Sequence, residues 1–318
     1  MTEREIQEQR RRKWRVAGNP VRTLEDAREF IESVGLCLLY PVKPPVLAPT
    51  FVGAYVGSES GLPTLRQAFA DARAREASEL MVRLLRERAA YEAHLFGDSF
   101  LVAASVFPYY YAVAGDRNPR QVPKKSGHAE TYSPLALDVL EMIRNEGPIS
   151  KKRLQEKLSG DLSEAALDRG LVELWTHLRI TRVDCTGEGA LWDVLYRWSP
   201  EAVKEGIQLS VGEALSALLS KYLECVIAAE PQEVEDFFSN LAPRSKVKEA
   251  INALQAGREL NFLHVGNRTL LHVTPPRLAA GGTRARGEGP GPSSASSEPQ
   301  PTSSTRARQE GPRARRHG

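Results

Sequence analysis

The candidate catalytic groups of this 318-residue chain are carboxylates and amides, because other common catalytic patterns are missing from its sequence. It contains no Gly-rich phosphate loop and no HExxH, GxSxG or kinase motif. The six histidines are scattered, and Cys37, Cys185 and Cys225 are far apart, so neither type shows zinc-ligand spacing. We therefore expect no metal ion and no cofactor.

A second group of residues, lysines and arginines near expected helix starts and hairpins, could contact DNA phosphates. These candidates are Lys151, Lys152, Arg153, Arg179, Arg182, Arg244, Lys246 and Lys248. Phosphate contacts position a protein on DNA without reading its sequence. The net charge is only +3, with much of the positive charge at the two ends, and one expected recognition helix carries Glu164, Asp168 and Glu173. This composition favours structure- or damage-directed binding over recognition of an operator.

Residues 132–203 show the pattern of a winged helix, the module that would position some of these side chains. Ser133-Pro134 predicts a helix start, and Gly147-Pro148 predicts its end. Two further helices and two strands are expected over residues 150–158, 163–178, 180–184 and 191–198. The third helix of such a module usually enters the DNA major groove, although winged helices also serve in protein–protein contacts.

Residues 204–275 repeat the same order of elements. Ser210 and Glu213 form a capping box before a long amphipathic helix. Two shorter helices follow, and Gly266-Asn267 between two alternating runs predicts a hairpin with a type II′ turn. Because the order repeats, we expect an α+β fold class, mostly α, built from tandem winged-helix modules.

We assign residues 21–114 to an N-terminal winged-helix-like domain. Thr23, with Asp26 three residues on, is a capping signal for its first helix, and another helix is expected over 78–93. The aromatic and apolar residues of 94–114 are typical of a core, with base stacking as the alternative.

The remaining segments are an arm, a linker and a tail. Residues 1–20 are a basic arm that either follows a phosphate backbone or forms a solvated, partly helical terminus. Residues 115–131 are expected to be a linker, and the Arg/Gly/Pro/Ser-rich residues 276–318 a disordered tail. There is no apolar run of membrane length and no secretory signal, so we expect a cytoplasmic, nucleoid-associated protein with no membrane partner.

Three short stretches resemble segments of the AlkZ/YcaQ winged-helix DNA glycosylases. Residues 30–34 (FIESV) resemble that family's Gln-x-Asp/Gln-Ser-Val segment. Residues 94–96 (HLF) and 104–108 (ASVFP) look like its Leu-Phe and Ala-Ser-Leu-Leu-Pro segments. The tandem winged helices also fit this family, and the resemblance extends over roughly residues 20–275.

The resemblance implies a monofunctional glycosylase that acts on double-stranded DNA, on N7- or N3-alkylated purines or on crosslinks. An alkylated purine is a cationic leaving group, so the enzyme mainly has to position water and stabilise an oxocarbenium-like sugar. In the family, two polar side chains of the motif do this. Here Phe30 replaces the first, so Glu32 is the candidate catalytic group, with Asp98 as a candidate second carboxylate.

Three alternatives stay open at this point. Glu32 also fits a solvated acidic helix face together with Glu25 and Glu29. The protein could instead be a non-catalytic winged-helix DNA-binding or regulatory protein, or a protein-interaction scaffold. Salt-sensitive duplex binding would separate the DNA-binding hypotheses from the scaffold, and base release would separate an enzyme from a regulator.

Overall fold

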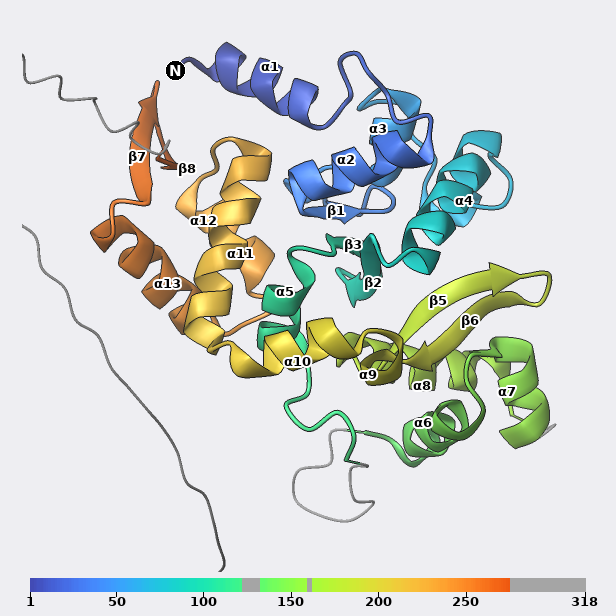
Figure 1. The fold of residues 1–318 in the computed structure, drawn as a ribbon. Coiled ribbons are helices and arrows are strands. Elements are labelled where there is room, and N and C mark those ends of the chain that lie inside the picture. The colour runs from blue at the N-terminus through green and yellow to red at the C-terminus, as the bar shows by residue number, and fades with distance from the viewer. Residues whose placement is uncertain (122–131, 159–161, 275–318) are drawn as a thin grey trace, which may run out of the picture. The chain divides into compact units, whose positions relative to one another are not determined.

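One order of elements occurs three times along the chain: a helix, a short extended segment, two helices and a β-hairpin (Figure 1). The computed structural model describes residues 1–121, 132–158 and 162–274. Backbone contacts group residues 1–275 into one unit. The α+β, mostly helical fold class is confirmed, whereas the expected tail over 276–318 lies outside the described residues.

The first repeat lies in residues 24–103 and was only partly anticipated. Its elements are α2 (Leu24–Val34), β1 (Leu36–Leu38), α3 (Phe51–Val56), a 3₁₀ turn η1 (Leu65–Gln67), α4 (Ala72–Arg86), β2 (Ala90–Leu95) and β3 (Asp98–Ala103). Thr23 and Asp26 form the predicted capping box, and Gly35 ends α2 with a φ of 74°. The strands form an antiparallel sheet in the order β1-β3-β2.

The prediction of a helix over 78–93 was wrong at both ends: α4 begins six residues earlier, at Ala72, and also ends earlier. α4 ends at Arg86, and the chain then forms the β2–β3 hairpin. Phe96 and Gly97 turn this hairpin with φ values of 56° and 76°, the positive pair that a type I′ turn requires. Phenylalanine is not a usual residue at such a turn, so the sequence gave little sign of it.

The second repeat follows the predicted order closely. Its elements are α6 (Pro134–Glu146), β4 (Ile149–Ser150), α7 (Lys151–Leu158), α8 (Glu164–Thr176), β5 (Ile180–Thr186) and β6 (Gly189–Val194). The sheet order β4-β6-β5 matches that of the first repeat. One expectation was wrong: β6 ends at Val194, and Leu195–Trp198 forms the short helix α9 instead of continuing the strand.

The third repeat begins after α10 (Pro200–Gln208) and has the order predicted for it. Its elements are α11 (Val211–Val226), α12 (Pro231–Phe238), α13 (Arg244–Ala256), β7 (Leu260–Val265) and β8 (Arg268–Val273). Ala229 alone takes the place of the short strand, pairing with Leu271 of β8. Gly266 has a φ of 58° at the predicted two-residue turn.

The turn after the third helix shows that the repeats share backbone detail. Arg88, Leu178 and Arg258 all adopt positive φ, at 56°, 53° and 59°. Each lies two residues after the end of α4, α8 or α13, and the amide of the following residue donates to a carbonyl five residues back. The same C-terminal geometry therefore links helix and hairpin in all three repeats.

The repeats differ in how they are joined. The first and third share one apolar core with α5 (Phe107–Ala114), whereas the second has its own core between its helices and sheet. The aromatic residues Phe100, Phe107, Tyr110 and Tyr111 are buried in the shared core. For these residues, the core hypothesis is confirmed and base stacking is wrong.

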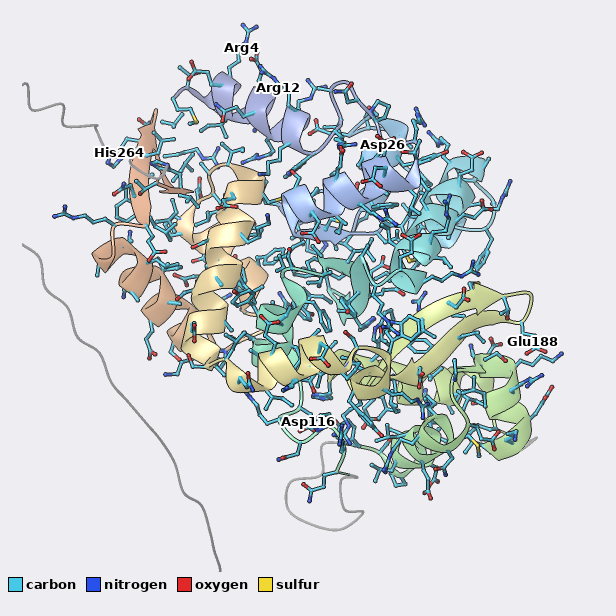
Figure 2. The ribbon with its side chains drawn as sticks, in the orientation of Figure 1. Arg4, Arg12, Asp26, Asp116, Glu188 and His264 are labelled. Atoms are coloured by element: carbon cyan, nitrogen blue, oxygen red, sulfur yellow. The ribbon has the colours of Figure 1, made fainter. Side chains whose placement is uncertain are left out.

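The N-terminal arm and the start of the expected linker are both bound to the rest of the protein. Arg10 of α1 (Glu3–Lys13) donates to the carbonyls of Val226 and Ala228, and Trp14, which follows this helix, donates to that of Cys225. Arg4 and Arg12 of α1 point outward (Figure 2). Burial lowers the pKa of the Arg10 guanidinium. Residues 115–121 are held by side-chain bonds of Arg117 and Arg179, and residues 122–131 lie outside the described part of the chain.

Candidate active site and nucleic-acid interface

Glu32 lies on the surface where three segments of the chain meet. It is exposed near the C-terminal end of α2, and its carboxylate accepts a hydrogen bond from Ser105 Oγ at 2.5 Å. Lys221 Nζ of α11 donates to the Glu32 backbone carbonyl at 2.9 Å. Two stretches that carry the family resemblance, 30–34 and 104–108, are therefore in direct contact, and the third repeat adds a cation beside them.

The neighbours of Glu32 on α2 have different environments. Glu25 and Glu29 are exposed on the same helix and form ion pairs with Arg28 and Arg15. Glu32 shares this exposed face but is bonded to a hydroxyl from another segment. The clefts of about 520 and 590 Å³ are lined by residues 42–47 with α12 and by residues 117–121 with α10, so Glu32 opens to the surface and not into either cleft.

Phe30, at the first position of the motif, points away from this surface. It is fully buried and packs against Phe51, with ring centroids 6.2 Å apart. A buried phenyl ring can neither polarise water nor stabilise a charged sugar. Any catalysis at this position therefore depends on Glu32 and on the hydroxyl and ammonium groups beside it.

Asp98 lies in a different place, at the start of β3 among other titratable groups. Burial raises the pKa of the Asp98 carboxyl and lowers the pKa of the His94 imidazole, and the attraction between the two charges opposes both shifts. Glu92 on β2 is completely buried, and Arg182 Nε of β5 lies 3.3 Å from its carboxylate. Among the described residues, neither oxygen of the Glu92 carboxylate accepts a hydrogen bond.

The structure does not bring Glu32 and Asp98 together. Asp98 begins β3, whereas Glu32 contacts Ser105 just beyond the other end of this strand. A strand of six residues spans about 17 Å. Paired carboxylates in glycosidases lie within about 10 Å of each other, so these two residues do not form such a pair.

The predicted phosphate contacts of the second repeat are mostly occupied by acidic partners. Lys151 lies 2.7 Å from Glu164 and 2.6 Å from Asp168, on the helix that was expected to recognise DNA. Arg153 lies 3.5 Å from Glu188, which Figure 2 labels near the β5–β6 hairpin. Lys152 is exposed and has no ion-pair partner among the described residues, so it is the contact of this group that remains most accessible.

Arg179 and Arg182 are structural side chains in this conformation, which removes them from our proposed phosphate contacts. Arg179 is 2% exposed, forms an ion pair with Asp116 and donates to the carbonyl of Gln121. Arg182 stacks on Trp175 at 4.5 Å and faces Glu92. The sequence pattern placed both beside a wing but could not show that the first repeat covers this side of the hairpin.

The candidates of the third repeat are exposed but paired. Arg244 lies 2.7 Å from Asp236, Lys246 2.7 Å from Glu249 and Lys248 3.5 Å from Glu235. Exposed ion pairs contribute only about 0–1 kcal/mol, so a phosphate can replace these acidic partners.

The sequence analysis did not identify α4, the third helix of the first repeat, as a candidate DNA contact, although its segment is more basic than that of the equivalent helix α8. Residues 64–86 contain five arginines against three acidic residues, whereas residues 163–178 around α8 contain one arginine against three. Arg66 and Arg83 are exposed and have no ion-pair partner among the described residues. A comparison of the net charges of the three equivalent helices would have found this surface. The comparison was not possible from the sequence, because the hairpin that completes the first repeat had not been predicted.

Within residues 1–121, 132–158 and 162–274, no group of three or more His, Cys, Asp or Glu side chains could hold a metal ion. Nor is any helix there long and apolar enough to cross a membrane.

Comparison with known proteins places these features in a family. The model of the family described as DNA glycosylase AlkZ-like matches residues 66–291, which is most of the chain. The chain belongs to the AlkZ-like DNA glycosylase family. The matched range includes Ser105 and Lys221 but begins after Glu32.

A solved structure shows the same fold as this AlkZ-like chain. The DNA glycosylase AlkZ of Streptomyces sahachiroi superposes with a TM-score of 0.55 at 14% sequence identity, covering 86% of this chain and 70% of that one. At this identity, the likeness concerns the fold alone. No curated protein sequence matches the chain.

Proposed function

We propose that this AlkZ-like protein binds double-stranded DNA and hydrolyses the N-glycosidic bond of a cationic, alkylated purine, with Glu32 as the catalytic carboxylate. The observation that carries the proposal is the 2.5 Å hydrogen bond between Ser105 and Glu32. This bond joins, at an exposed surface, two of the segments that resemble the AlkZ/YcaQ family. Membership of the AlkZ-like family supports the reaction class. An enzyme of this kind would act in the cytoplasm with the nucleoid.

The chemistry needs only groups that the chain supplies. Water adds to the anomeric carbon, the N-glycosidic bond breaks with its electrons going to the cationic base, and the Glu32 carboxylate accepts a proton from the water. The products are a free base and an abasic site. As the bonding electrons leave with the base, the positive charge moves from the base to the sugar, and the Glu32 carboxylate stabilises this developing charge. The Ser105 hydroxyl holds the Glu32 carboxylate in one orientation.

The test is base release from a duplex that contains N7-methylguanine, with DNA binding measured in the same samples. The wild type is expected to release the base, and Glu32→Gln to bind the duplex without releasing it. Glu29→Gln is the matched control, because Glu29 is exposed one turn earlier on the same helix. Equal release by the wild type and Glu32→Gln would contradict the role of Glu32.

One observation favours a second candidate function, a DNA-binding protein that does not cleave. Phe30 is completely buried, so the motif provides one polar side chain where the family has two. In that case, the wild type would bind duplex DNA in a salt-dependent way and release no base from either alkylated or crosslinked substrates. Absence of binding at low salt would contradict both candidates.

A further inference from the structure

The segment between α3 and α4 carries an aromatic side chain that almost no protein atom covers. Phe69 is 91% exposed, far more than the other exposed large apolar residues described, and Leu65 in the same segment is 49% exposed. Single exposed apolar residues are common on protein surfaces and need no explanation by themselves. The environment of Phe69, however, differs from that of a residue on a loose loop.

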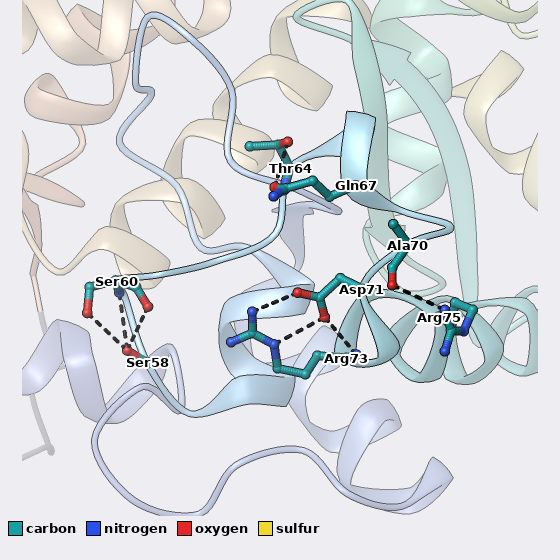
Figure 3. A network of polar contacts seen from close by, with 8 residues as sticks. All are labelled: Ser58, Ser60, Thr64, Gln67, Ala70, Asp71, Arg73 and Arg75. Carbon is teal, nitrogen blue, oxygen red and sulfur yellow. Dashed lines mark hydrogen bonds and ion pairs between the residues drawn. The ribbon is translucent and has the colours of Figure 1, made fainter.

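Hydrogen bonds hold the segment before and after Phe69; Figure 3 shows those of Thr64 with Gln67, of Arg75 with Ala70 and of Asp71 with Arg73. Arg75 Nη1 donates to the Phe69 carbonyl at 2.8 Å and to that of Ala70 at 3.4 Å. Before it, the amide of Thr64 donates to the side chain of Gln67 at 3.0 Å. After it, Asp71 caps α4 and binds Arg73, which lowers the pKa of the Asp71 carboxyl to about 2. The backbone is fixed while the phenyl ring is left in solvent.

The position and charge of the segment indicate what would cover the ring. Phe69 lies three residues before the start of α4 (Ala72–Arg86), which is the third helix of the first repeat and so occupies the place of a DNA-recognition helix. The charge of Arg66 has no acidic partner among the described residues, and Arg75 is bonded to carbonyls instead of a carboxylate. Glu76, which follows Arg75 in the sequence, accepts a hydrogen bond from the Tyr55 hydroxyl.

We propose that Phe69 is a wedge that enters the base stack of double-stranded DNA, while Arg66 and Arg75 contact the flanking phosphates. The inference rests on the proposed DNA binding and adds to it the residue that opens the duplex. Apolar wedges of this kind unstack a base step and kink the DNA. Unstacking lowers the cost of turning a damaged base out of the helix, which an enzyme acting on that base requires.

The experiment uses the full chain and a short duplex with a single 2-aminopurine, whose fluorescence rises when it is unstacked. Duplex binding is followed by anisotropy at low salt. The wild type is expected to bind and to raise the fluorescence, and Phe69→Ala to lose this rise and to bind roughly tenfold more weakly, the loss typical of one stacked base. Phe69→Trp is expected to restore both signals.

The matched control is a substitution of an exposed phenylalanine far from α4 in the sequence. Phe262→Ala removes another exposed phenylalanine, 53% exposed on β7 of the third repeat, and is expected to behave as the wild type. Duplex binding without a fluorescence rise would overturn the wedge and leave the proposed DNA binding intact. Absence of binding by the wild type would overturn both. A fluorescence rise that Phe69→Ala retains, or a change in oligomeric state with this substitution, would also overturn the wedge, the latter because a second copy of the chain would then cover Phe69.

Discussion

The first repeat is joined to the third by apolar side chains and to the second by a buried polar layer. On the side of the third repeat, Phe96 and Phe100 approach Phe237 with ring centroids 5.2 and 6.1 Å apart. On the side of the second repeat, Glu92 is fully buried against Arg182, and Trp175 Nε1 donates to the Glu92 carbonyl at 2.9 Å. Apolar contacts therefore stabilise the junction with the third repeat, and buried polar contacts stabilise the junction with the second.

This difference determines how each junction responds to change. Apolar burial has no protonation state, so its contribution to the free energy of unfolding does not change with pH. A buried ion pair contributes little beyond an apolar pair of similar volume, but removing one partner leaves an uncompensated charge. We therefore expect the apolar junction to be tolerant of pH and the polar junction to be sensitive both to pH and to single substitutions.

The largest effect is expected from Arg182→Met, which leaves the Glu92 carboxylate buried without its cation. Breaking a buried pair in this way lowers the free energy of unfolding by about 4 kcal/mol. Urea unfolding measures this loss. The double variant Glu92→Leu with Arg182→Met is the control and should recover most of the stability. A loss below about 1 kcal/mol in the single variant, the range of exposed pairs, would show that the polar junction is not a buried ion pair.

A somewhat smaller effect is expected from Leu219→Ala in α11, which opens a cavity in the apolar core shared by the first and third repeats. Leu219 is completely buried there. Such a truncation lowers the free energy of unfolding by about 3 kcal/mol. The loss should be the same at pH 5 and pH 8, and a clear pH dependence would contradict the contrast between the two junctions.

The pH response of the polar junction should be visible at His94. Burial lowers the pKa of His94 below its ordinary value of 6.5, Asp98 opposes this shift, and Arg182 adds to it. Because the folded pKa is depressed, the stabilising contribution is fully present above pH 6.5 and is lost as the pH falls toward the folded pKa. His94→Gln should reduce this acid destabilisation, as measured by thermal unfolding between pH 7 and pH 5. An unchanged pH profile would exclude His94 as its source.

The smallest effect is expected from Thr181→Val, which removes one hydroxyl from the polar junction at nearly constant volume. Thr181 Oγ1 donates to the Glu92 carbonyl at 3.3 Å, and Trp175 also donates to that carbonyl, so it keeps a partner. The loss in free energy of unfolding should be about 0.5–1 kcal/mol. The exposed Thr186→Val is the control, and an equal loss there would show that the position in the junction is irrelevant.

The fold could be predicted where local signals agreed with the final structure. Caps, breakers and hydrophobic spacing were enough for α2, for the second repeat as far as Val194, and for the hairpin around Gly266. The hairpin of the first repeat was missed, because its turn at Phe96 lacks the usual Asn-Gly or Asp-Gly signal.

The candidate site could be predicted only in part, because burial and pairing arise from contacts far apart in the sequence. Spacing alone could not show that Ser105 bonds to Glu32, that the second repeat covers Glu92, or that Arg179 is buried against Asp116. The exposed aromatic Phe69 was also missed, since its sequence gives no periodic pattern that marks exposure.

Single-turnover release of N7-methylguanine from duplex DNA measures whether this AlkZ-like chain hydrolyses the N-glycosidic bond and whether it does so through Glu32. We expect release by the wild type and by Glu29→Gln, and none by Glu32→Gln at equal DNA occupancy. Release by Glu32→Gln at the wild-type rate, or binding by the wild type without any release, would contradict the proposed role of Glu32.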